Sequence, residues 1–190
     1  MRITGKTRLL PIIGHPVSGV FSPPAFNLAF QERRLDFTMV PMDVPAASLK
    51  AFWNLLRNSA NMIGCSVTYP HKQAAFDAMD DCTPRAARLK AVNTVRSESS
   101  RLTGDATDGL AMCTAIDATG IAIKNGVAHV IGAGGGAGTA IVDALCERGI
   151  SELVISETNG NRAKSVKTFL AQFWPNVIVS KSTKPSAILI

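Results

Sequence analysis

The sequence predicts two consecutive α/β domains, the first built around a mostly parallel sheet. Short apolar runs alternate with helical patterns through the first half of the chain, and a polar hairpin near residue 98 interrupts this alternation. A glycine-rich string between an apolar run and a helical pattern opens the second half. Strict alternation of strand and helix is typical of parallel sheets covered by helices. We place the domains at residues 1–107 and 125–190, with a linking helix over 108–124.

The first half supplies three strand and helix pairs. Strands are predicted over residues 8–14, 36–44 and 62–68, and each is followed by a helix. The first helix is expected to begin at Ser22-Pro23 with Ser22 as its N-cap, because serine caps well and proline suits the first turn. The second is expected to begin at Pro45 and the third at Pro70. In the second helix four apolar residues share one face: Leu49, Phe52, Trp53 and Leu56.

The pattern then changes before the second domain. A short helix is predicted over residues 83–91, followed by a hairpin whose strands flank the polar turn Ser-Glu-Ser-Ser. Residues from Asp108 to about Ala118 have a helical pattern, and Asn125-Gly126 is a turn signal. The segment 186–190, at the end of the chain, is expected to be the fourth strand of an incomplete second domain.

Composition excludes several classes of protein. Of the 190 residues, 46% are hydrophobic and 18% are charged, which is typical of a globular protein. No apolar run approaches the ~20 residues that span a membrane. The charge of +6 is spread without dense blocks, which argues against a nucleic-acid module. The four cysteines and three histidines show no metal-ligand spacing, so we expect reduced thiols and no metal site. The short apolar run near the N-terminus carries Pro11 and lacks a small-residue cleavage site, so we expect a first strand there and not a secretory signal, and a cytoplasmic location.

The string GAGGGA matches a dinucleotide-binding pattern. Gly132, Gly134 and Ala137 occupy the three small positions of G-x-G-x-x-G/A, with Gly135 and Gly136 between them. The first glycine permits a tight turn, the second allows close approach of a pyrophosphate, and the third small residue lets helix and strand pack closely. The helix N-terminus then presents N–H groups to the phosphates. We therefore predict a partial Rossmann domain, with a purely structural glycine turn as the alternative.

The residues after the next strand bear on the choice of dinucleotide. Glu157 follows this strand at about the distance where a carboxylate meets the adenosine ribose, which is ~20 residues beyond the loop. A carboxylate accepts hydrogen bonds from the ribose hydroxyls of NAD and repels the 2′-phosphate of NADP. Thr158 and Arg162 complete the predicted cofactor site, and Arg162 could still contact a phosphate. The cofactor is therefore expected to be NAD or NADP, with NAD favoured by Glu157.

Lys72 and Asp108 are the candidate acid–base pair. Lys72 begins a helix face that continues with Ala75, Phe76 and Met79, so its amine is expected to be partly desolvated, which suits a proton-transferring group. Asp108 begins the linking helix, at the expected edge of a cleft between the two domains. Each residue also has a simpler interpretation. The stem of Lys72 could cover the apolar face while its amine reaches water, and Asp108 could cap its helix.

Five motifs give the chain a specific resemblance. IGHPVSGVFSPPAFN, SVTYPHK, AVNTV, GDATDG and GAGGGA occur in the order and spacing of the shikimate dehydrogenase family, which includes quinate/shikimate dehydrogenases. The resemblance covers nearly the whole chain. It implies reversible, NAD(P)-dependent oxidation of a ring hydroxyl of a cyclic hydroxy acid. We expect a monomer or homodimer with no nucleic-acid or membrane partner. The resemblance also implies that Lys72 and Asp108 form the catalytic pair.

The resemblance further implies a substrate site and shows where this chain departs from the family. Substrate contacts fall on Ser22, Ser66, Thr68 and Asn93. Val20 replaces the first of two serines, Ser66 stands in place of an asparagine, and Ala106 replaces the asparagine of N-T-D. The family's N-R-T reads Ser156-Glu157-Thr158, and family members continue beyond residue 190. These departures leave the substrate open among shikimate, quinate and related acids, and they motivate a non-catalytic dinucleotide- or ligand-binding homologue as the alternative.

Overall fold

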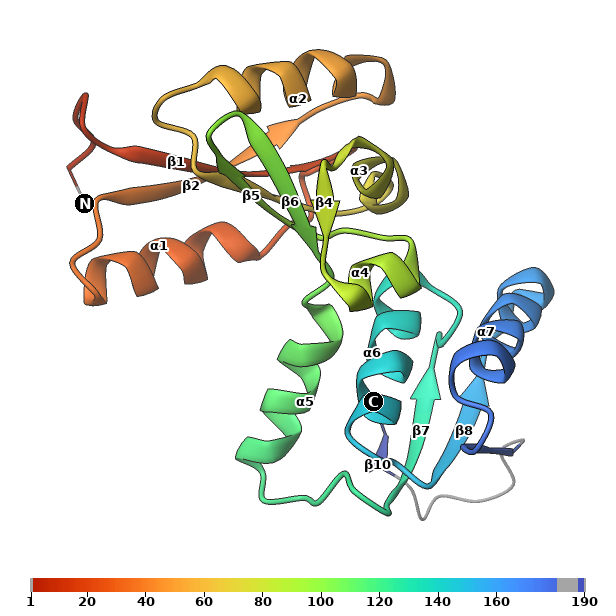
Figure 1. Cartoon of the computed structure of the whole chain (residues 1–190). Helices are drawn as coiled ribbons and strands as arrows, with labels where there is room; N and C mark the ends of the chain where they lie inside the picture. Colours follow the sequence, from red (N-terminus) through yellow and green to blue (C-terminus); the bar gives the residue numbers. More distant parts are fainter. Residues whose placement is uncertain (1, 181–187, 190) are drawn as a thin grey trace. The chain divides into compact units, whose positions relative to one another are not determined.

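The chain divides into two compact units. A computed structural model describes residues 2–180 and 188–189, and its units are Met1–Ala106 and Thr107–Ile190 (Figure 1). The helix expected over residues 108–124 corresponds to α5, Asp108–Ala118, which is grouped with the second unit.

A six-stranded sheet forms the centre of the first unit. Its strand order is β2-β1-β3-β5-β6-β4. The strands are β1 Arg8–Gly14, β2 Phe37–Asp43, β3 Gly64–Val67, β4 Asp81–Cys82, β5 Thr94–Glu98 and β6 Arg101–Asp105. β1 pairs in parallel with β2 and β3, and β4 pairs in parallel with β6. The hairpin of β5 and β6 is antiparallel, as predicted, and Ser99 and Ser100 form its turn with positive φ angles.

The described part of the first unit also contains four α-helices and one 3₁₀ turn. They are α1 Ser22–Glu32, η1 Ala46–Ser48, α2 Leu49–Asn58, α3 Lys72–Ala78 and α4 Pro84–Leu89. The prediction that Ser22 caps α1 is wrong, because Phe21 occupies the N-cap position and makes no side-chain cap. Pro23 and Pro24 fill the second and third positions of the helix, so the N–H groups that an N-cap at position 21 would serve are missing. α3 begins at Lys72 and not at Pro70.

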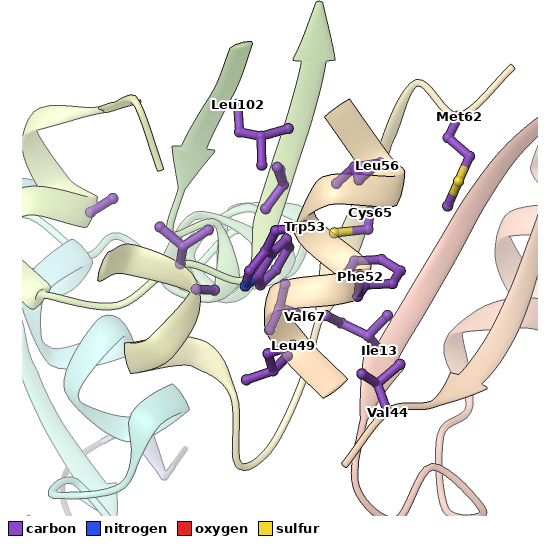
Figure 2. Close-up of a cluster of buried hydrophobic side chains, with 14 of the residues drawn as sticks. Ile13, Val44, Leu49, Phe52, Trp53, Leu56, Met62, Cys65, Val67 and Leu102 are labelled. Carbon is purple, nitrogen blue, oxygen red and sulfur yellow. The ribbon is translucent and has the colours of Figure 1, made fainter. Parts of the chain in front are cut away.

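The predicted face of α2 is buried in the core of the first unit. Leu49, Phe52, Trp53 and Leu56 are all buried, and they belong to one cluster with residues of the sheet. Figure 2 shows these side chains beside Cys65 and Val67 of β3. The hydrophobic periodicity of residues 49–56 therefore predicted both the helix and the side that it buries.

The second unit is a parallel sheet with helices α5, α6 and α7. Its strands are β7 Val127–Ile131, β8 Glu152–Ser156, β9 Ile178–Ser180 and β10 Ile188–Leu189, and its remaining helices are α6 Gly136–Glu147 and α7 Gly160–Phe173. The strand order β10-β7-β8-β9 matches strands 4-1-2-3 of a Rossmann sheet, which are one half of that sheet and the first strand of the other half. β10 pairs in parallel with β7, whereas the rest of the expected strand over 186–190 lies outside the described residues. The predicted fold class is confirmed.

Helices capable of crossing a membrane are absent from the part of the chain that the structure describes.

Candidate functional site

The glycine loop of the second unit makes a tight turn between β7 and α6. Gly132 has a φ of +72°, in the region that favours glycine. Its N–H donates to the carbonyl of Ser156 at 2.7 Å, and the N–H of Gly135 donates to the carbonyl of Gly132 at 3.0 Å. Gly135 is the N-cap residue of α6, so the loop leads directly into the helix that Gly136 begins. The loop therefore ends at free N–H groups of a helix N-terminus.

Two glycines of this segment have no room for a side chain. A Cβ at Gly134 would lie 2.6 Å from the carbonyl oxygen of Arg162, and one at Gly138 would lie 2.2 Å from that of Gly132. The prediction that Ala137 provides the close approach is wrong, because Ala137 is exposed and Gly138 faces the loop backbone. The sequence contains glycine at positions 132, 134 and 138, and this spacing could have identified Gly138 as the residue of close approach.

Glu157 lies against the glycine loop. Its Oε1 accepts a hydrogen bond from the N–H of Asn159 at 3.0 Å, and its Oε2 accepts one from the N–H of Gly134 at 3.1 Å. These N–H groups, with that of Asn159 contributing most, hold the pKa of Glu157 below its ordinary value. The carboxylate is therefore charged at neutral pH and stands at the carboxyl end of β8.

The start of α7 completes this cluster. Asn159 caps the helix, because its Oδ1 accepts hydrogen bonds from the N–H groups of Asn161 and Arg162 at 3.1 Å. Thr158 precedes this cap, and the backbone of Arg162 packs against Gly134. The structure thus brings the predicted cofactor residues of the second unit together around one loop. The close backbone packing, the tight turn and the adjacent carboxylate all fit a dinucleotide.

Backbone hydrogen bonds gather four predicted residues of the first unit at one edge of its sheet. Ser66 lies in β3, where it pairs with Ile12 of β1 and Thr94 of β5. The N–H of Thr68, directly after β3, donates to the carbonyl of Ile13 at 2.8 Å. This edge therefore carries the carboxyl end of β3 and the amino end of β5.

Asn93 and Lys72 join the same edge. The carbonyl of Asn93 accepts a hydrogen bond from Val67 at 2.8 Å, and its N–H donates to the carbonyl of Asp105 at 2.9 Å. The carbonyl of Lys72 accepts from the N–H of Val92 at 2.9 Å. Ser22 begins α1, in the same unit.

Lys72 and Asp108 occupy the first positions of two helices in different units. Lys72 begins α3 and is half-buried, while Ala75 on the same face is fully buried and Phe76 and Met79 pack against the core. The apolar face is thus confirmed. Asp108 begins α5, three residues beyond the end of β6. Their pairing stays a prediction.

An ion pair that the sequence did not indicate stands just before Asp108. The carboxylate of Asp105 accepts hydrogen bonds from Arg85 Nε and Nη2, both at 2.8 Å, and from Thr83 Oγ1 at 2.6 Å. Burial would raise the pKa of Asp105, but the hydrogen bonds from Arg85 and Thr83 outweigh it and lower this pKa. Asp105 therefore joins α4 to the end of β6 as a charged group.

A second pair that the sequence did not indicate lies at the ends of β1 and β2. His15 Nδ1 and Asp43 Oδ1 are 2.6 Å apart, and both side chains are about half exposed. The hydrogen bond from His15 is the main cause that lowers the pKa of Asp43. Such pairings between distant residues leave no periodic signal in a sequence.

Comparison with known proteins gives the family. Residues 12–95 match the family profile of the shikimate dehydrogenase substrate binding domain. The shikimate dehydrogenase (NADP(+)) of Citrifermentans bemidjiense is 43% identical over 142 residues, which cover 74% of this chain and 49% of that protein. The protein of the same name from Methanothermobacter thermautotrophicus is 31% identical over an alignment of 195 positions, covering 99% of this chain and 68% of that protein.

A solved structure has the same fold. The shikimate 5-dehydrogenase of Listeria monocytogenes, solved in complex with shikimate and NAD, matches with a TM-score of 0.86 and 29% identity, over 96% of this chain and 63% of that one. This chain spans about half to two thirds of the length of such relatives. On these similarities, this chain belongs to the shikimate dehydrogenase family.

Proposed function

We propose that this chain acts in NAD(P)-dependent hydride transfer to and from a ring hydroxyl of shikimate, quinate or a related cyclic hydroxy acid. The observation that carries the proposal is the glycine loop of residues 132–135, packed against Arg162 and the Glu157 carboxylate, in a chain whose other unit matches a substrate binding domain. The names of the relatives, which specify shikimate and NADP(+), support the same reaction.

The residues of the first unit would bind the substrate and move its proton. Hydroxyl and amide groups suit a polyhydroxylated acid, and they are supplied by Ser22, Ser66, Thr68 and Asn93. We assign Lys72 as the group that takes the hydroxyl proton during oxidation and returns it during reduction. Asp108 is assigned as its carboxylate partner, which would orient the amine.

The second unit would hold the cofactor. A bound nicotinamide dinucleotide would supply the hydride acceptor, with its pyrophosphate on the loop that Gly132, Gly134 and Gly138 shape. Gly135, Gly136 and Ala137 lie at the N-terminus of α6, next to this loop. We propose that NAD is preferred, because the charged carboxylate of Glu157 would accept hydrogen bonds from ribose hydroxyls and repel a 2′-phosphate.

Turnover by the purified chain tests the reaction. We expect NAD⁺ or NADP⁺ reduction with shikimate or quinate, and a fall in kcat of about 10²–10⁴ for Lys72→Ala. Lys50→Ala, on the exposed side of α2, is the matched control and should leave kcat unchanged. Absence of turnover with every pair of substrate and cofactor, together with unaltered ligand binding by Lys72→Ala, would reject the proposal. Binding of cofactor by calorimetry without turnover would select the non-catalytic homologue instead.

Cofactor choice has its own test. Glu157→Gln should raise the affinity for NADP⁺ relative to NAD⁺ by about tenfold, because it removes one unit of negative charge beside the ribose. Glu152→Gln, at the opposite end of β8, removes the same charge and should leave the ratio unchanged. An equal effect of both substitutions would assign the change to net charge and not to a contact with the ribose.

A further inference from the structure

A cavity lies in the first unit, at the end of the sheet away from the predicted substrate residues. Its volume is about 640 Å³, which is within the range of small-molecule sites, about 300–1,000 Å³. Arg8 begins β1, whereas Gly14 ends this strand at the substrate edge. Likewise Glu98 ends β5, whereas Thr94 begins it beside Asn93. The cavity and the substrate residues therefore occupy opposite ends of the same strands.

Hydrogen bonds join the segments around this cavity, which include α2 and the hairpin of β5 and β6. Arg57 Nη1 donates to the carbonyl of Ser100 at 3.1 Å, and Arg57 Nη2 donates to that of Ala78 at 2.9 Å. Ser97 Oγ donates to the carbonyl of Leu56 at 3.1 Å, and the N–H of Ser97 donates to that of Ile63 at 2.9 Å. The segments that form the walls are thus tied to one another.

The lining carries an excess of positive charge. Three guanidinium groups, those of Arg8, Arg57 and Arg96, line the cavity together with one carboxylate, that of Glu98. Three positive charges against one negative charge leave an excess of two. Arg96 pairs with Glu98, and Arg57 pairs with Asp80 outside the lining. Among the residues that the structure describes, Arg8 makes no ion pair, and its side chain is exposed.

Hydroxyl and guanidinium groups together are suited to an oxyanion. Ser59, Ser99 and Ser100 belong to the same lining. The guanidinium fork binds carboxylate and phosphoryl groups through two parallel hydrogen bonds. We infer that this cavity is a second ligand site, which binds a small metabolite carrying phosphoryl or carboxylate groups, and that it is separate from the proposed substrate and cofactor sites.

Calorimetric titration of the whole chain tests the inference. The probes are pyrophosphate for the phosphoryl class and citrate for the carboxylate class, each titrated at low and at physiological salt. For at least one probe we expect saturable binding that depends on Arg8 and Arg96, apart from any binding of pyrophosphate at the loop proposed for the cofactor. Arg8→Gln and Arg96→Gln should each weaken binding by about tenfold or more, because each removes a charge-assisted hydrogen-bond donor. Arg33→Gln, at the end of α1 and outside the cavity, removes the same charge and should change the affinity less than about twofold.

The outcomes separate a site from general attraction to a basic protein. Saturable binding that Arg8→Gln weakens and Arg33→Gln does not would support the inference, and the stronger probe would identify the ligand class. Absence of saturable binding, or equal weakening by all three substitutions, would overturn it. The titrations measure binding and not turnover, so their result does not depend on the proposed dehydrogenase activity.

Discussion

Gly138 shows how one missing side chain shapes the predicted cofactor loop. An alanine Cβ there would lie 2.2 Å from the carbonyl oxygen of Gly132, and backbone atoms cannot give way as a flexible side chain can. Gly138→Ala should therefore lower the free energy of unfolding of the second unit by about 1–3 kcal/mol and weaken dinucleotide binding. Urea denaturation and calorimetry measure the two effects. Gly160→Ala is the matched control, since its Cβ would meet nothing within 4 Å, and an equal loss in that variant would contradict the explanation.

Asp105 is a residue at which stability should depend on pH. Its folded-state pKa is lowered, so its contribution to stability is present above the ordinary value of 3.8 and is lost as the pH falls through the folded-state pKa. Asp105→Asn should lower the free energy of unfolding of the first unit by about 1–3 kcal/mol near neutral pH, because it weakens the paired hydrogen bonds of Arg85. The difference from the unsubstituted protein should shrink in acid.

Chemical denaturation at a series of pH values measures this difference. Asp77→Asn, an exposed position on α3, serves as the control for lost negative charge. A difference for Asp105→Asn that stays constant from neutral to acidic pH would exclude the ion pair as its cause.

At the scale of elements, α2 offers adjacent leucines in opposite environments. Leu56 is fully buried in the core, and Leu55 is 50% exposed. Leu56→Ala should cost about 2–5 kcal/mol of the free energy of unfolding, because it leaves a cavity. Leu55→Ala should cost less than about 0.5 kcal/mol, since it empties no core position. Similar losses for both, measured by urea denaturation, would mean that helix propensity and not burial determines the stability of α2.

The elements were predictable where one short-range signal dominates. The face of α2 followed from its period, and the hairpin of β5 and β6 followed from two apolar runs around a serine turn. Helix starts were less predictable. α1 began with Ser22 as its first residue and Phe21 as its N-cap, one position earlier than expected, and α3 began at Lys72, two residues after the expected proline. Both segments carry proline near the helix start, and because proline is tolerated in the first turn it does not determine which residue begins the helix.

In the candidate site, too, local patterns were predictable from the sequence and contacts between distant residues were not. The glycine loop and Glu157 followed from a local pattern, although the close contact fell on Gly138 and not on Ala137. The bond from Gly134 to Glu157 and the pair of Arg85 with Asp105 were not predictable, because they join residues about 20 positions apart that only the folded sheet brings together. Periodicity reports which side of an element is buried, and it carries no information about partners on other elements.

At the scale of the whole molecule, each unit has a hydrophobic core of its own. The first includes Leu56, Ile13 and Val67, and the second includes Leu145 and Leu153, with no residue in common. A separate core makes each unit capable of cooperative unfolding by itself. Leu56→Ala should therefore speed amide exchange mainly in β1 and β3, and Leu145→Ala, which removes another fully buried side chain, should speed it mainly in β7 and β8.

Hydrogen exchange followed by mass spectrometry of peptides from both units measures this pattern. Each variant is the control for the other, because the two substitutions delete the same atoms from different cores. A substitution that lowers protection by about 2 kcal/mol or more in its own unit and leaves the other unit unchanged would show two cooperative units. Equal loss of protection in both units from either substitution would show that the chain unfolds as one, and the separation of the cores would then have no thermodynamic consequence.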